Sequence, residues 1–73
     1  MKIVTYPNVL VMKKAVSDKL GLYLHFHDGC GSQYFSFDAP VNEEVQEWLK
    51  NYFLTNWECN LKFTPSCMEF TLE

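Results

Sequence analysis

The fold is decided by the stretch LGLYLHFHDGCGSQYFSFD, residues 20–38, in which apolar and polar side chains alternate on both sides of a glycine-containing turn. A period of two is typical of strands that bury one face. With the turn centred on residues 30–31, Phe26 opposes Phe35, and the other apolar side chains of the two arms oppose each other in the same way. Because a shift by one residue would turn every side chain to the other face, this agreement predicts a β-hairpin.

The polar face of this hairpin carries tyrosine and histidine side chains. In the same register His25 opposes Ser36 and His27 opposes Tyr34, and Tyr23 shares their side. Tyrosine is common in protein interfaces because it combines a large contact area with a polar tip. We therefore expect a protein-binding surface on this face, extended by nearby acidic residues. The residues predicted to take part are Tyr23, His25, His27, Asp28, Tyr34, Glu43 and Glu44.

An amphipathic helix is predicted after the hairpin, over about residues 40–56. Apolar side chains recur there at spacings of three and four, and they form one broad stripe. Asp38 or Asn42 can cap the start of the helix, and Pro40 suits its first turn. The apolar stripe is expected to pack on the apolar face of the sheet.

A second hairpin is predicted over residues 58–73, with its turn centred on the proline–serine step. Apolar residues then oppose each other on one side, while Lys62 opposes Glu69 on the other, as a cross-strand pair of opposite charge. The same register places Cys59 inside and Cys67 outside. These two thiols are therefore not expected to bond to each other.

The chain before the first hairpin allows two interpretations. Residues 2–6 suit a strand that ends at a proline, and residues 9–12 suit a second strand because β-branched residues are enriched in strands. Alternatively, Asn8 caps a helix that ends at Gly21. We favour the strands. The helical alternative would place on one face Val9, Met12, Val16 and Leu20.

Together these elements predict a single α+β domain over residues 1–73. An antiparallel sheet of four or five strands packs one face against one helix, in the order β(β)ββαββ. The chain is 48% hydrophobic and 16% aromatic, which supplies enough apolar surface for a core in so short a chain. The other face of the sheet is expected to be exposed or covered by a partner.

Composition narrows the classes of function. The chain has nine acidic residues, six lysines and no arginine, with a formal net charge of −3. General nucleic-acid binding needs a basic face, whereas an acidic surface suits a partner with a basic one. An odd number of cysteines favours a reducing compartment, and no apolar run is as long as a membrane helix. We therefore expect a cytoplasmic protein, in the host cell if phage-encoded, that does not bind membranes.

Two alternative functions use other residues. His25, His27 and Cys30 carry imidazole and thiolate groups that can bind zinc, but structural zinc sites usually present two spaced pairs of ligands. The metal-binding alternative therefore lacks half of the usual pattern. A weak nucleic-acid-binding domain would instead use Lys2, Lys13, Lys14 and Lys19.

The sequence contains no catalytic motif or phosphate-binding loop that we can identify. We expect a non-enzymatic protein-binding module without a cofactor, which inhibits or regulates a larger macromolecular complex. Anti-CRISPR and anti-restriction proteins of phages or mobile elements are of this kind. An open sheet edge could also pair with the edge of a second copy and form a homodimer.

Overall fold

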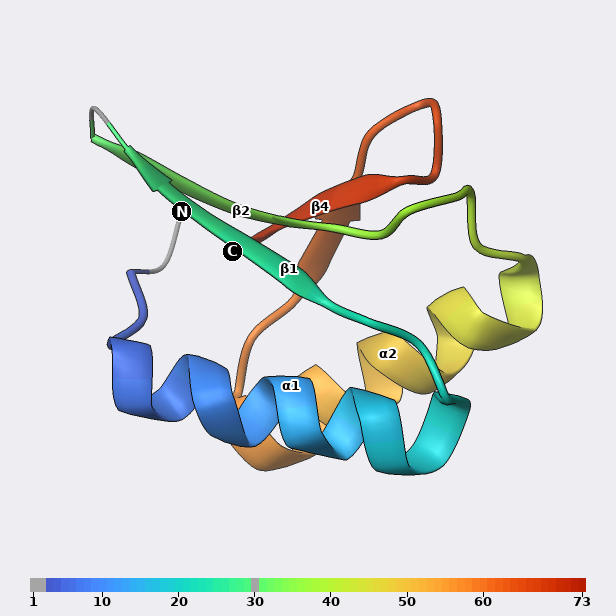
Figure 1. The fold of residues 1–73 in the computed structure, drawn as a ribbon, viewed down its shortest axis with the longest axis horizontal. Helices are drawn as coiled ribbons and strands as arrows, with labels where there is room; N and C mark the ends of the chain where they lie inside the picture. The colour runs from blue at the N-terminus through green and yellow to red at the C-terminus, as the bar shows by residue number, and fades with distance from the viewer. Residues whose placement is uncertain (1–2, 30) are drawn as a thin grey trace.

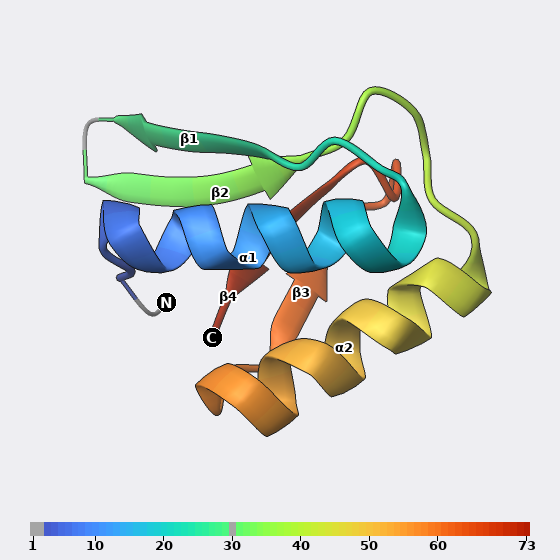
Figure 2. The ribbon, with the colours of Figure 1, turned by 60° about the horizontal axis from the view of Figure 1, so that its bottom comes forward.

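The computed structural model describes residues 3–29 and 31–73. The described strands form one antiparallel sheet in the order β1-β2-β4-β3, and both helices lie on the same face of it (Figure 1, Figure 2). The predicted α+β class and antiparallel sheet are confirmed, but the observed order is αββαββ. In chain order, the elements are α1 (Tyr6–Leu20), β1 (His25–Gly29), β2 (Ser32–Ser36), α2 (Glu43–Trp57), β3 (Leu61–Phe63) and β4 (Glu69–Leu72).

The strands predicted between residues 2 and 12 are wrong where the structure describes them, because this segment opens helix α1. The buried residues of α1 are Val9, Met12 and Val16. Their spacings of three and four place them on one side of a helix but on both faces of a strand. The preference of β-branched residues for strands is weak, and packing against a core overrides it.

Both ends of α1 have a clear local cause. The N-cap residue is Thr5 rather than Asn8, and Pro7 occupies the first turn, where its missing N–H would have no helical partner anyway. At the other end, Gly21 adopts a φ of 66° and donates its N–H to the carbonyl of Ser17 at 3.0 Å. Glycine takes this left-handed conformation without a steric penalty, so the predicted helix stop is confirmed.

The register predicted for the first hairpin is confirmed along the β1–β2 ladder. Alternating side chains therefore lie on opposite faces as expected, with phenylalanines toward the helices and histidines away from them. Cys30, one of the two residues on which the turn was centred, lies outside the described residues. The confirmed pairs are His25 with Ser36, Phe26 with Phe35, and His27 with Tyr34.

The register predicted for the second hairpin is wrong by two residues. Lys62 lies opposite Thr71 rather than Glu69. An even shift keeps each side chain on its predicted face, so only the charge pair is lost. The longer loop has a tertiary cause: the carbonyl of Met68 accepts the N–H of Phe37 at 2.8 Å, so Met68 is held beside the end of β2.

The two described cysteines follow the sequence prediction in part. Cys59 is buried in the core cluster, while Cys67 is half-buried in the β3–β4 loop with a φ of 60°. Both are free thiols. The prediction that they do not bond to each other is therefore confirmed.

Helix α2 begins at Glu43, three residues later than predicted. The side chain of Asn42 accepts the N–H of Val45 at 2.9 Å, which confirms one of the two predicted caps. Pro40 lies before the helix. Between them Val41 is buried and donates its N–H to a carbonyl of the β3–β4 loop at 3.0 Å. This bond fixes the backbone in a non-helical position just before Asn42.

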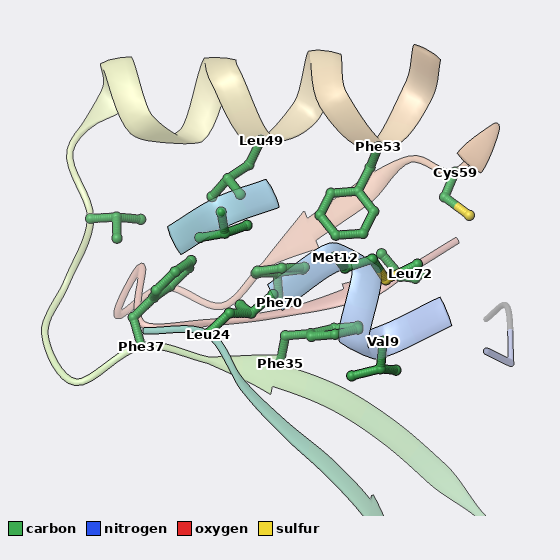
Figure 3. Packing of buried hydrophobic residues seen from close by; sticks show 12 residues of the cluster. Val9, Met12, Leu24, Phe35, Phe37, Leu49, Phe53, Cys59, Phe70 and Leu72 are labelled. Atoms are coloured by element: carbon green, nitrogen blue, oxygen red, sulfur yellow. The ribbon is translucent and has the colours of Figure 1, made fainter. Parts of the chain in front are cut away.

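The core lies between the sheet and the two helices, and phenylalanine rings fill its centre (Figure 3). Phe70 of β4 stacks on Phe35 of β2, with ring centroids 5.1 Å apart and planes 11° apart. Phe53 of α2 meets the Phe70 ring edge to face at 5.7 Å. All three side chains are almost completely buried, so each ring depends on the others for its packing.

Replacing Phe70 by alanine should lower the free energy of unfolding by about 3–5 kcal/mol, because the ring is lost and a cavity remains. Urea denaturation followed by tryptophan fluorescence measures this change. The control is Leu10→Ala on the outward side of α1, where the side chain is 49% exposed, with an expected effect of about 0.5 kcal/mol. Similar losses for the two variants would contradict the described core.

Candidate functional site

The sheet face opposite the helices, which we call the outer face, carries the polar side chains of the strands. Neither helix covers it (Figure 1). The residues of the outer face are identified from the strand pairings, because side chains that pair across strands share a face. The outer face contains His25, His27, Ser32, Tyr34, Ser36, Lys62, Glu69 and Thr71.

His27 of the edge strand β1 and Tyr34 of β2 form a stacked pair on this face. Their ring centroids are 4.4 Å apart and their planes are 10° apart. His27 Nε2 also lies 2.8 Å from the Oγ of Ser36, so the imidazole is held both by a ring and by a hydroxyl. Aromatic pairs in such geometry add about 0.5–1.5 kcal/mol beyond area burial. The imidazole of His27 therefore has two contacts within the protein itself.

His25 is held by a second set of contacts. Its Nε2 lies 2.8 Å from Oδ1 of Asp38, and its ring centroid lies 4.6 Å from that of Tyr23. Tyr23 is 66% exposed, and the Nζ of Lys13 lies 5.7 Å from the centre of its ring. Asp38 was considered only as a helix cap, so this contact extends the predicted surface by one carboxylate.

The other predicted residues lie elsewhere. Asp28 pairs with Gln33 across the hairpin, which places it on the side opposite His27. Glu43 and Glu44 lie exposed in the first turn of α2, in the helical layer, where acidic side chains stabilise the positive end of the helix dipole. The structure therefore brings together Tyr23, His25, His27 and Tyr34, but not the three acidic residues.

A hollow of about 240 Å³ adjoins the stacked pair on its β4 side. It opens where β2 and β4 diverge beyond their paired residues. Tyr34, Glu69 and Thr71 contribute to its wall, and Glu69 is half-buried. Local sequence patterns do not indicate this hollow, because it depends on how the two hairpins meet. The complete lining is Ser32, Gln33, Tyr34, Thr64, Glu69, Phe70 and Thr71.

Ser36 and His27 resemble a nucleophile with a base, but among the described residues no carboxylate contacts His27. Such a base is normally oriented by a third group. The carboxylate of Asp38 contacts His25 instead. His27 is exposed to solvent, whereas nucleophilic chemistry depends on a site that excludes water. The hydrogen bond between Ser36 and His27 is best explained as a structural contact.

The metal-binding alternative gains no support from the described residues. Within residues 3–29 and 31–73, no group of three or more His, Cys, Asp or Glu side chains is placed to hold a metal ion. Cys30, the third member of the predicted set, lies outside them. His25 and His27 each direct Nε2 to a partner in the protein.

No known protein family, curated protein or solved structure matches this chain. In the described part of the chain, neither helix has the length and apolar character needed to cross a membrane.

Replacing Asp38 by alanine should shift the imidazole resonances of His25 and leave those of His27 unchanged, because only His25 contacts that carboxylate. The free energy of unfolding should change by less than about 1 kcal/mol, since the pair is exposed. Imidazole NMR spectra and urea denaturation measure the two effects, with Glu43→Ala as the control. Equal shifts at both histidines would contradict the described contacts.

Proposed function

We propose that this protein is a non-enzymatic protein-binding module, which inhibits or regulates a larger macromolecular complex through its outer face. One observation carries the proposal: both helices pack on the inner face of the sheet, and the outer face presents ordered tyrosine and histidine rings. Antiparallel sheets often leave one face to solvent. A face that presents aromatic rings is also suited to binding a protein partner.

The outer face has the composition of an interface centre. Tyrosine is enriched among the residues that dominate binding energy, and such residues lie in the middle of an interface with polar groups around them. Here the stack of His27 on Tyr34 supplies the aromatic rings, and the same face carries polar groups that include Glu69 and Lys62. Because the rings are already held by contacts within the protein, less conformational entropy is lost on binding.

The expected partner has a basic surface. Residues 28–73 contain two lysines against eight acidic residues, and the outer face and its border include the carboxylates of Asp38 and Glu69. Opposite charges across an interface increase the association rate and the specificity. The narrower expectation of a phage anti-defence protein rests on size and composition, and it stays a prediction.

Capture of partners from the native host lysate tests the proposal directly. The protein is used without an affinity tag at two salt concentrations, and bound proteins are identified by mass spectrometry. The expected result is one stoichiometric protein whose binding weakens at the higher salt concentration. Capture of nucleic acid alone, with a steep dependence on salt, would instead support the nucleic-acid-binding alternative.

Tyr34→Ala should weaken binding of the captured partner by at least about tenfold, as expected for an aromatic contact worth more than about 1.4 kcal/mol. Lys50→Ala, an exposed position on α2, serves as the matched control and should bind normally. Affinities are measured by calorimetry after the unfolding free energies have been compared. Normal binding by both Tyr34→Ala and His27→Ala would exclude the outer face as the contact surface.

Self-association of the protein is the competing outcome. The two edge strands of the sheet, β1 and β3, differ in how readily they could pair with a second copy. The β3 edge is three residues long and carries Lys62, and short edges with lysine resist pairing. The β1 edge is five residues long and contains neither lysine nor proline.

Under the proposed function the protein should sediment as a monomer in analytical ultracentrifugation. A dimer that dissociates when His25 is replaced by lysine would instead indicate pairing through β1. The matched comparison is Lys62→Thr on the β3 edge, which should not dissociate a dimer that pairs through β1.

A further inference from the structure

Glu69 has an unusual setting in the hollow beside Tyr34. It pairs with Ser36 in the β2–β4 ladder and is half-buried, while Thr64 and Thr71 line the hollow with it. Among the described residues, no side chain makes a hydrogen bond or ion pair with its carboxylate. A partly desolvated carboxylate is stabilised by a cation with hydrogen-bond donors.

The opposite wall of the hollow is aromatic. Strand β2 lies between β1 and β4 in the sheet, so His27 contacts Tyr34 from the β1 side and the hollow lies on the β4 side. The histidine stack therefore covers one side of the tyrosine ring and leaves the other toward the hollow. An aromatic ring with an accessible face attracts cations.

On the basis of the proposed function, we infer that this hollow binds an arginine side chain of the partner protein. A planar guanidinium can stack on an aromatic ring and pair with a carboxylate through two hydrogen bonds at once. Its remaining N–H groups have acceptors in the hydroxyls of Ser32 and Thr71, which line the hollow. A lysine ammonium would meet the charge of Glu69 but would lack the flat shape.

Two observations support an arginine from another protein. The hollow of about 240 Å³ is far larger than the roughly 10–15 Å³ that one water molecule needs, so it has room for a side-chain head group. The chain contains no arginine of its own, so neither an intramolecular contact nor a second copy can supply one. The inference therefore commits to a different protein as the occupant.

A peptide titration tests the inference without knowledge of the partner. The probe is N-acetyl-Gly-Arg-Gly-amide, and amide NMR spectra follow the protein. The expected result is saturable shifts at Tyr34, Glu69 and Thr71. The citrulline peptide has the same shape without the charge, and it should bind about tenfold more weakly, as a lost charged hydrogen bond implies. Equal affinities for the two peptides, or shifts confined to other residues, would overturn the inference.

Glu69→Gln provides the matched variant, since it keeps the size of the side chain and removes its charge. The arginine peptide should bind it about tenfold more weakly, while Glu47→Gln on the exposed side of α2 should bind normally. Thr71→Val removes one hydroxyl without changing the shape and should give a smaller loss. Unchanged affinity in Glu69→Gln contradicts the assigned role of the carboxylate.

The captured partner separates this inference from the proposed function. If Tyr34→Ala loses the partner but Glu69→Gln binds it normally, the outer face remains the proposed contact surface and the arginine site is wrong. If both variants bind it normally, the outer face and the arginine site are both wrong. If both variants lose the partner, replacement of individual arginines in that partner by lysine should reproduce the loss at one position. Failure of every such replacement also overturns the inference.

Discussion

The contact between Phe70 and the rings around it is the interaction on which the rest of the structure depends. Phe70 stacks on Phe35 at 5.1 Å, meets Phe53 at 5.7 Å, and lies within 5.2 Å of the ring of Phe63. These neighbours come from β2, α2 and β3, which have few other links. The β2–β4 ladder contains only two paired positions. Burial of the rings therefore joins two hairpins whose shared ladder of backbone pairs is short.

The way in which the hairpins join also creates the candidate site. Because β2 and β4 diverge soon after Phe35 and Phe70, the outer face is hollowed beside Tyr34 instead of flat. On the inner side of the same region, Gln33 is buried, and its side-chain amide accepts the N–H and donates to the carbonyl of Val4 at 2.8 and 3.1 Å. The segment before α1 thus satisfies the buried side-chain amide of Gln33.

Prediction from sequence succeeded where two local signals agreed. In the first hairpin, the alternation on both arms and the glycines of the turn specify the same register, and a slip by one residue would expose Phe26 and Phe35. In the second hairpin the alternation was read correctly but the turn was not. The proline suggested a tight turn, whereas the bond from Phe37 to Met68 holds the loop open. A slip by two residues leaves alternation unchanged, so alternation alone could not reveal it.

By itself, the sequence determined which side chains share a face. The histidines and tyrosines of the first hairpin were placed correctly because side-chain direction in a strand depends only on residue parity. The tertiary structure decided the rest. It made residues 6–20 a helix because burial of Val9, Met12 and Val16 outweighs a weak strand preference, and it separated Glu43 and Glu44 from the outer face. It also placed Glu69 beside Tyr34, since contacts between distant segments depend on packing in three dimensions, which local periodicity does not record.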